Sequence, residues 1–442
     1  MFQTFKNAWR VPEIRSKLIF TLVIVLLYRL GACVQVPFTN YDAIEASLGS
    51  SGGNMFAYLN ILSGESFARG TLFALGVSPY ITASIVIQLL TVAIPVFERW
   101  QKSGEEGQKK LTQLTRLITV VLAFLTAWGY YMFLDSKENT LVDIGSDVFR
   151  AFVIIFCYAA GASLVMWLAE KINDGGIGNG ISIILFANII ASTASTGITL
   201  ASFAIENAWH LVFVEVLVFA LLAMVTFVVF VTNSERRLPV QYAKKVVGRK
   251  MMGGQSTTLP IKLNMSGVMP IIFANSIVAL PQTFQLIFQG KYKSDGFWAK
   301  FFEVTSHTSP LYAILFFILI IAFAYFYILI SFNPIEVANN LKKNGGFIPG
   351  IRPGKPTADY ITKVLNRITL IGALFLAVIA VLPLVVNMIA AAVAPNNYIA
   401  QQLGSLAFGG SSLLIVVGVI LETVRELDAQ LTMRHYKGGF LD

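Results

Sequence analysis

The chain has 442 residues, of which 56% are hydrophobic and 13% are charged, and its formal net charge is +9. Its mean hydropathy is +0.69. Soluble domains carry about 25% charged residues, so the composition excludes an ordinary soluble domain and indicates a polytopic membrane protein. Two cysteines, Cys33 and Cys157, lie in apolar runs, which predicts small buried thiols and neither a disulfide framework nor a metal site.

The first 17 residues contain four basic residues together with Phe2, Phe5 and Trp9, which share one helical face. This pattern favours a helix lying on the membrane surface. The run 18–36 is too long for a typical apolar signal core and lacks an obvious cleavage site, so we predict a first span instead of a signal peptide. The sequence predicts ten spans, at about 18–36, 79–96, 115–134, 148–170, 180–197, 209–232, 266–288, 309–332, 366–390 and 406–424.

The stretch 61–95 is too long for one crossing, which takes about 20 apolar residues. Its first part is small and half polar, and Gly76 and Pro79 follow, both of which weaken a helix. We therefore predict a short half-helix, a break and a full span. Broken backbone at membrane depth is tolerated only against protein or a watery cavity, so the half-helix is expected to line or block a cavity. An external loop leading into an ordinary span is the alternative.

Lysine and arginine give the expected orientation. Six segments hold 26 of the 33 basic residues, six more lie in the remaining loops, and Arg29 lies in the first span. Cytoplasmic loops carry the excess of basic residues, so both termini are expected in the cytoplasm. The basic segments are 1–17, 97–116, 171–180, 233–263, 333–367 and 425–442.

Two loops on this basic side, about 233–264 and 333–367, are longer than a connection between adjacent spans requires. The first contains three basic pairs, and prolines and glycines in the second predict a turn that projects Arg352. Contact with anionic lipid is one interpretation. An anionic partner, such as RNA or an acidic protein face, is the other.

The sequence shows no nucleotide-binding, zinc-protease or serine-hydrolase motif. The glycine-rich run 175–180 joins two predicted spans and follows no strand, so we predict neither an enzyme nor a cofactor. Arg29 and Glu215 lie in apolar runs, where a charge costs about 2.5–3.5 kcal/mol on insertion scales. Each needs a partner or an interior position, and both packing and transport remain open roles.

Four segments resemble the SecY family, the channel subunits of the bacterial Sec protein translocon. They are FALGVSPYITASIVIQLLT, GGIGNGISIILFA, QSTTLPIKLNMSGVMPIIFA and NPIEVANNLKKNGGFIPGIRPG. The resemblance implies an all-α polytopic membrane protein, with ten transmembrane helices in two pseudo-symmetric five-helix halves around a central pore. The halves would be residues 1–200 and 201–442, and a plug half-helix would occupy about 61–72.

The resemblance also implies roles for individual residues. The plug would include Leu62, Ser63, Gly64, Phe67, Ala68 and Arg69, and an apolar pore ring would comprise Val77, Ile81, Ile181, Leu185, Ile272 and Ile415. Two pairs of ring residues are four apart, so each pair shares a helix face. A ring of branched aliphatic side chains can exclude ions by dewetting. Family rings are often richer in isoleucine, from which Val77 and Leu185 depart slightly.

A lateral gate toward lipid is implied at Thr82, Ile85, Gln88, Asn275 and Leu280. Gln88 and Asn275 are amides in apolar spans, where interhelical hydrogen bonds are worth about 0.6–2 kcal/mol. Bonds of this strength could break when a signal sequence enters between the helices. Simple helix packing is the alternative role for these two amides.

The basic loops resemble those that bind the ribosome or the SecA motor, with matching residues Arg237, Lys244, Lys245, Arg249, Lys250 and Arg352. The resemblance implies SecE and SecG as membrane partners, and signal sequences, nascent polypeptides and lipid as ligands, in the bacterial inner membrane. The alternative function is a secondary transporter with broken helices. It would need convergent polar groups at the break, where Val77 and Ile81 stand instead. An intramembrane enzyme would need a paired catalytic set, which we do not find.

Overall fold

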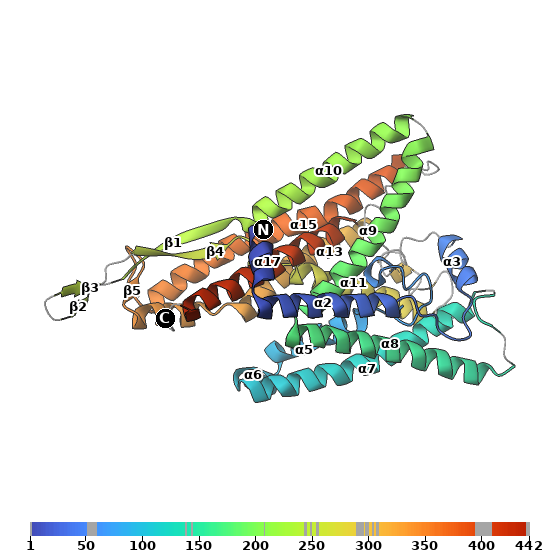
Figure 1. Ribbon diagram of the computed structural model, residues 1–442, viewed down its shortest axis with the longest axis horizontal. Helices are drawn as coiled ribbons and strands as arrows, with labels where there is room; N and C mark the ends of the chain where they lie inside the picture. Colours follow the sequence, from blue (N-terminus) through green and yellow to red (C-terminus); the bar gives the residue numbers. More distant parts are fainter. Residues whose placement is uncertain are drawn as a thin grey trace.

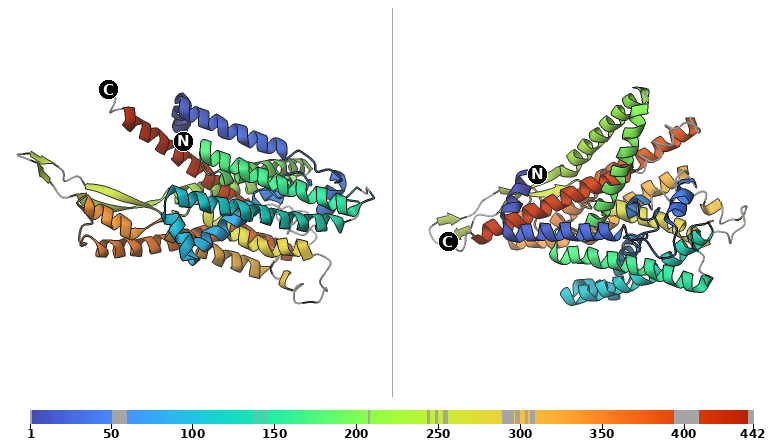
Figure 2. Two further views of the ribbon diagram at one scale, coloured as in Figure 1. Left: turned by 90° about the horizontal axis from the view of Figure 1, so that it is seen from below. Right: turned by 45° about the vertical axis from the view of Figure 1, so that its right-hand side comes forward.

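The computed structural model describes the whole chain except residues 1, 51–59, 138, 143–144, 207, 243–244, 248–249, 253–255, 289–295, 297–299, 303–304, 306–308, 394–408 and 439–442. The described residues are mostly helical, and the long helices run broadly along the longest axis of the molecule (Figure 1). A narrow β-ribbon extends beyond the helices at one end (Figure 2).

Each of the ten predicted spans coincides with a described helix. These helices are α2 (Pro12–Gly31), α5 (Ser78–Ala93), α7 (Glu105–Asp135), α8 (Asp147–Gly175), α9 (Gly180–Glu206), α10 (Ala208–Asn233), α11 (Met269–Phe288), α13 (Pro310–Ser331), α15 (Lys355–Val393) and α17 (Gly409–Gly438). By length and hydropathy alone, five described helices qualify as membrane spans, or six if α5 and α6 (Pro95–Lys102) are joined across a 101° bend. Helices α2 and α17 fall short because they carry more charged residues, and within the fully described residues the apolar stretches of α9 and α11 are Gly180–Ser195 and Met269–Pro281.

The bend between α5 and α6 has a local cause. Ile94 is extended, with φ −115° and ψ 118°, and it precedes Pro95. A proline disfavours helical geometry in the residue before it. The span predicted at 79–96 therefore ends at Ala93, and α6 leaves at an angle.

The half-helix expected over 61–72 requires correction. Only residues 60–63 are helical, and the chain then continues in turns to residue 77. Gly64, Gly70 and Gly76 have φ of 63°, 58° and 55°, and Glu65 has φ of 71°. A right-handed helix needs negative φ, so these four residues prevent a regular half-helix.

The first long basic loop forms strands that the sequence did not predict. Strands β1 (Glu235–Tyr242) and β4 (Ser256–Lys262) pair antiparallel, and the tip carries β2 (Lys245–Val247) and β3 (Lys250–Met252). Strand β5 (Gly346–Phe347), from the second basic loop, adds to β1 through Gln241 and Tyr242. The two basic loops are therefore joined in one three-stranded sheet of order β4-β1-β5.

Three short helices complete the described fold: α1 (Phe2–Arg10), α3 (Tyr41–Ser50) and α14 (Pro334–Lys343). Helix α1 contacts α17, and Ala8 is buried there. Phe5 and Trp9 are 45% and 55% exposed, which leaves two aromatic residues of the predicted membrane-facing side uncovered by the rest of the chain.

Two hydrophobic clusters position the segment before α5. The larger joins residues of α5 and α9 with residues of α11 and α17. The smaller lies among α7, α8 and residues 67–75. Helix α9 continues through residue 200 to Glu206, and the division of the chain into 1–200 and 201–442 stays a prediction.

Candidate functional site

Five of the six predicted ring residues belong to the larger hydrophobic cluster, and Ile181 packs against it. Five of the six are no more than 4% exposed, and Ile181 is partly buried. Helix α17 contacts both α9 and α11, and α11 contacts α5. The structure therefore brings together the four elements that carry these aliphatic side chains. That the six side chains line a pore stays a prediction.

We call residues 60–77, which include the plug predicted at about 61–72, the plug segment. Five of its backbone carbonyls accept hydrogen bonds from side chains of α2, α7, α8 and α9. The bonds are Arg29 Nη1 to Gly64 O (3.1 Å), Asn188 Nδ2 to Leu62 O (2.7 Å), Ser192 Oγ to Ile61 O (3.3 Å), Tyr130 OH to Phe67 O (2.6 Å) and Tyr158 OH to Gly70 O (3.1 Å). Turns leave carbonyls without helical partners, and unpaired carbonyls are costly when buried. These side chains supply donors to all five carbonyls, and Ile61 O and Phe67 O also accept from the backbone N–H groups of Gly64 and Gly70.

Aromatic contacts and a close approach of two backbones also hold the plug segment against α7 and α8. The Phe67 ring lies 4.7 Å from that of Tyr130, and Tyr130 meets Tyr158 edge-on at 5.0 Å. At Gly161 on α8, an added Cβ would lie 2.0 Å from the Leu72 carbonyl oxygen. The plug segment thus rests directly on the backbone of α8.

Two of the predicted gate residues, Thr82 on α5 and Leu280 on α11, line one cavity of about 130 Å³. Leu62 of the plug segment, Thr126 of α7 and Ser276 of α11 line it as well. A third predicted gate residue, Ile85, is buried in the larger hydrophobic cluster. The cavity therefore lies where α5, α7, α11 and the plug segment meet.

The two predicted gate amides make no interhelical hydrogen bond among the described residues. Gln88 Nε2 donates to Ser84 Oγ, one turn earlier on α5, at 3.3 Å. Asn275 is 4% exposed and its Nδ2 has no partner in the described part of the chain. The expected amide link across the gate is thus not formed, because Gln88 satisfies its donor within its own helix.

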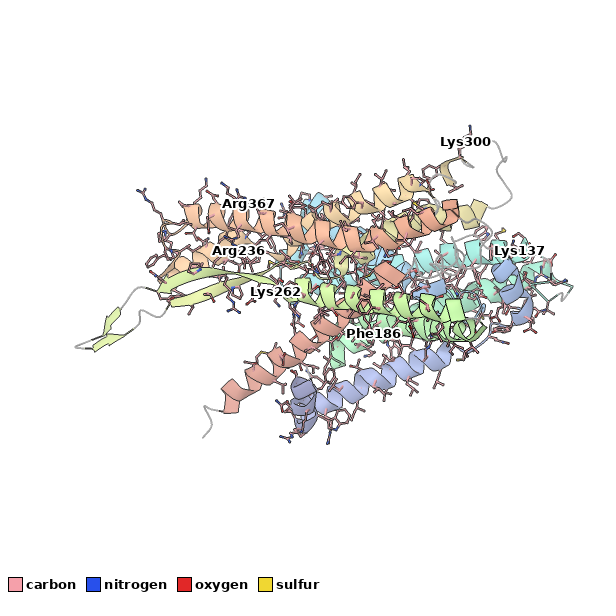
Figure 3. All side chains as sticks on the ribbon, turned by 90° about the horizontal axis from the view of Figure 1, so that it is seen from above. Lys137, Phe186, Arg236, Lys262, Lys300 and Arg367 are labelled. Atoms are coloured by element: carbon pink, nitrogen blue, oxygen red, sulfur yellow. The ribbon has the colours of Figure 1, made fainter. Side chains whose placement is uncertain are left out.

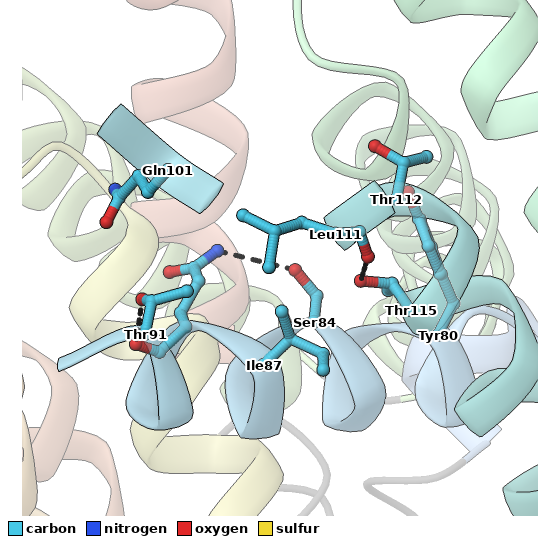
Figure 4. Close-up of a pocket in the computed structure, with 9 residues that line it drawn as sticks. Tyr80, Ser84, Ile87, Thr91, Gln101, Leu111, Thr112 and Thr115 are labelled. Atoms are coloured by element: carbon cyan, nitrogen blue, oxygen red, sulfur yellow. Dashed lines mark hydrogen bonds between the residues drawn. The ribbon is translucent and has the colours of Figure 1, made fainter. Parts of the chain in front are cut away.

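Gln88 instead lines a second cavity, of about 220 Å³, among α5, α6 and α7. Figure 4 shows Ser84, Thr91, Thr112 and Thr115 around it. Thr91 and Thr115 use their hydroxyl hydrogens on carbonyls of their own helices. This cavity is separate from the one that contains Thr82 and Leu280.

The described docking residues are divided among the three-stranded sheet, the two-stranded sheet β2-β3 at the ribbon tip and the turn before α15. Arg237 on β1 is exposed and its Nε donates to Glu235 Oε1 at 2.7 Å. Lys245 and Lys250 lie on β2 and β3, whereas Lys244 and Arg249 fall outside the described residues. Arg352 is exposed in the expected turn between α14 and α15.

The labelled basic residues form two groups at opposite ends of the molecule's long axis. Figure 3 shows Arg236, Lys262 and Arg367 toward the end that carries the ribbon, and Lys137 and Lys300 toward the other end. Burial, and then the charge of Arg425, lowers the pKa of Lys262 at the base of the sheet. The labelled basic residues of the two predicted basic loops therefore lie toward one end of the molecule.

Comparison with known proteins identifies the family. A sequence profile described as SecY matches residues 71–424. "Protein translocase subunit SecY" of Streptomyces galbus is 42% identical, and the proteins of that name from Mycobacterium tuberculosis strains are 43% identical. Each match covers 99% of this chain and 99% of the relative. This chain belongs to the SecY family.

Solved structures support the fold expected of a SecY-family chain, ten membrane helices with a plug. The structure titled "The structure of a protein conducting channel" has a TM-score of 0.59 at 18% identity, and it covers 95% of this chain and 96% of its own. "Sec61 in the Canine ribosome-channel complex from the endoplasmic reticulum" has a TM-score of 0.54 at 17% identity, with the same coverage.

Sequence reasoning missed the residues that fasten the plug segment in this SecY-family chain. Asn188, Tyr130 and Tyr158 are fully buried and donate to plug carbonyls. A signal existed for Asn188, since its span is rich in Ser, Thr and Asn. Arg29 was expected to need a partner and finds one in Gly64 O, while Glu215 is exposed on α10. Among the described residues, no group of His, Cys, Asp and Glu could hold a metal ion.

Proposed function

We propose that this chain is the protein-conducting channel of a bacterial Sec translocon. Unfolded polypeptides would cross the membrane through it, and membrane helices would leave it sideways into lipid. The observation that carries the proposal is its similarity, at about 42% identity over full length, to protein translocase subunits. The chain is a conduit and not an enzyme, as expected for this family.

The proposed seal is the ring of Val77, Ile81, Ile181, Leu185, Ile272 and Ile415. Its support is that five of the six belong to one apolar cluster at the meeting of four elements, and that Ile181 packs against this cluster. Aliphatic side chains exclude ions by dewetting, yet they form no hydrogen bonds that would hold one peptide sequence over another. The plug residues Leu62, Ser63, Gly64, Phe67, Ala68 and Arg69 would close the same passage.

The proposed lateral gate is the contact between α5 and α11. Thr82 and Leu280 share one cavity there, and Ile85 is buried nearby in the cluster. A signal sequence could enter between these helices at small cost, since the described gate amides do not link them. Asn275 would then offer its unpaired donor to an incoming chain.

The basic residues of the two loops form the proposed docking site for the SecA motor or the ribosome. Arg237, Lys245, Lys250 and Arg352 support it, with Lys244 and Arg249 by sequence alone. Two solved structures of this fold are titled as complexes with ribosomes, the canine Sec61 and the yeast Ssh1 complex. SecE and SecG are the proposed membrane subunits.

The proposed location is the bacterial inner membrane, with both termini cytoplasmic and with halves 1–200 and 201–442 on either side of the pore. The charge asymmetry of the loops supports this orientation. A secondary transporter is not favoured, because the relatives are translocase subunits.

The proposal is tested by reconstituting the chain with its SecE-type subunit into proteoliposomes and adding SecA, ATP and a precursor protein. We expect protease-protected precursor only in vesicles that contain this chain and only with ATP. A precursor without its signal sequence serves as the control. Absence of protected precursor, from vesicles in which the complex is intact and binds SecA, would contradict the channel function, and ion-coupled uptake of a small solute would support the transporter.

A further inference from the structure

The cavity of about 220 Å³ among α5, α6 and α7, which we call the α5–α7 cavity, is polar although it lies between membrane helices. None of the described residues that line it carries a charge. A single water needs at least about 10–15 Å³, so the cavity has room for a small polar group. Its hydroxyl and amide groups come mainly from Ser84, Gln88, Thr91, Gln101, Thr112 and Thr115 (Figure 4).

The threonine hydroxyls of the α5–α7 cavity have already used their hydrogens. Thr91, Thr112 and Thr115 donate to backbone carbonyls of their own helices, at 2.7, 3.0 and 2.9 Å. Gln88 Nε2 donates to Ser84 Oγ at 3.3 Å, and the carbonyl oxygen of this amide is an acceptor. A hydroxyl that has spent its hydrogen can only accept. The cavity therefore offers a ligand mainly oxygen lone pairs.

An excess of acceptors favours a ligand that is rich in donors. An alkylammonium group has three N–H donors and no acceptor, whereas carboxylate and phosphate oxygens only accept. A cation also favours the face of an aromatic ring, and Tyr80 lines the cavity. The α5–α7 cavity therefore suits a primary amine in its protonated form.

The surroundings of the α5–α7 cavity indicate that lipid supplies this amine. Val92 on α5, Val96 on α6 and Leu117 on α7 are 58%, 51% and 62% exposed, and lipid tails are as apolar as such side chains. Helix α6 turns by 101° from α5, and it carries Trp100, a residue type enriched at membrane interfaces. Gln101 of the cavity lies on this helix. The cavity is therefore at the level of lipid headgroups.

We propose that the α5–α7 cavity binds the amine headgroup of a phospholipid, of which phosphatidylethanolamine is the simplest, in the leaflet next to α6. The ammonium group donates to the oxygen atoms of Thr91, Thr115 and Gln88. The acyl chains lie along the exposed apolar side chains of α5 and α7. This binding is independent of what the channel conducts.

The test compares two lipids that differ only in their N–H groups. The full chain, purified with the subunits that accompany it, is equilibrated with equal amounts of phosphatidylethanolamine and phosphatidylcholine of the same acyl chains. Native mass spectrometry then counts the bound lipids. We expect phosphatidylethanolamine to be retained about five- to tenfold more, which corresponds to one or two hydrogen bonds. Equal retention would overturn the proposal. Stronger retention of phosphatidylglycerol in a third mixture would overturn it too, because phosphate would then be the recognised group.

Variants assign the preference to the α5–α7 cavity. Thr91→Val with Thr115→Val removes two acceptors at nearly constant shape, and the ratio of the two lipids should fall to about one. The matched control is Thr119→Val with Thr369→Val. These two buried threonines make the same bond to their own helices and do not line the cavity, so the ratio should equal that of the parent.

A second variant covers the case in which the double valine chain does not fold. Leu111 lines the α5–α7 cavity, and Leu111→Phe fills it without removing a hydroxyl. We expect this change to lower bound phosphatidylethanolamine several-fold while the accompanying subunits still copurify. A preference for phosphatidylethanolamine that survives in the folded cavity variants would place the lipid elsewhere and overturn the proposal.

Discussion

At the scale of single residues, Arg29 shows what a sequence can and cannot predict. A charge in an apolar run demands a partner, and that need was evident from the sequence. The partner is the Gly64 carbonyl, 35 positions along the chain. No acidic residue marks such a partner in the sequence, because the free carbonyl arises from the turn geometry at Gly64 and Glu65. The same reason hid Asn188, Tyr130 and Tyr158.

The ring can be tested at Ile415, which is 2% exposed. Ile415→Asn places an amide among aliphatic side chains, where burial without a partner costs about 1–3 kcal/mol. We expect the closed state to weaken by about five- to a hundredfold. Precursors with defective signal sequences should be exported more readily, and ion conductance of the resting channel should rise.

The matched control for this substitution is Ile420→Asn, on the same helix at a position 39% exposed. It places the same amide on α17 away from the cluster core, so export stringency and conductance should stay at the parent values. Equal effects at both positions would assign the change to α17 as a whole. Unchanged behaviour of Ile415→Asn would remove that residue from the ring.

At the scale of elements, each long helix overlaps a span predicted from the sequence, because a run of about 20 mostly apolar residues marks a span. Hydropathy could not predict the strands at 235–262, since their pattern of basic and small apolar residues is also that of an irregular loop. It gave the plug segment too much helix, because a positive φ at Glu65 is invisible in a spacing argument. The end of α5 at Ala93 was missed although Pro95 gave a signal.

The proposed gate is tested by cysteines at Thr82 and Leu280, in a chain without Cys33 and Cys157. The Cα atoms of a disulfide are usually about 4.4–6.8 Å apart. Thr82 and Leu280 are candidates for such a bond because both line one cavity. We expect oxidation to join α5 to α11 and stop translocation, and reductant to restore it. Single cysteines are the controls. Normal secretion with the bond formed would reject the gate.

Seating of the plug segment on α8 is tested at Gly161. Gly161→Ala places a Cβ 2.0 Å from the Leu72 carbonyl oxygen, so backbone must move, and overpacking of this kind costs about 1–3 kcal/mol. We expect a lower thermal unfolding midpoint in detergent. The control is Gly197→Ala on α9, where an added Cβ has no other atom within 4 Å. Its unfolding midpoint should equal or exceed that of the parent, because alanine stabilises a helix by about 1 kcal/mol relative to glycine.

At the scale of the whole molecule, the charge bias predicts which end faces the cytoplasm. Arg236 and Lys300 lie toward opposite ends (Figure 3) and both are exposed. In a chain whose native cysteines are replaced, Arg236→Cys should react with a membrane-impermeant maleimide only from the cytoplasmic side, and Lys300→Cys only from outside. Reaction of Lys300→Cys in inverted vesicles, with intact membranes, would reverse the orientation.

The pairing of β5 with β1 makes the fold partly independent of the covalent continuity of the chain. Strand β1 pairs with β4 through seven residue pairs along one edge and with β5 through two residue pairs along its other edge. A chain divided between residues 247 and 250 would keep all of these pairs. Two coexpressed fragments, 1–247 and 250–442, should therefore assemble into one particle, as a noncovalent complex that copurifies through a tag on either piece.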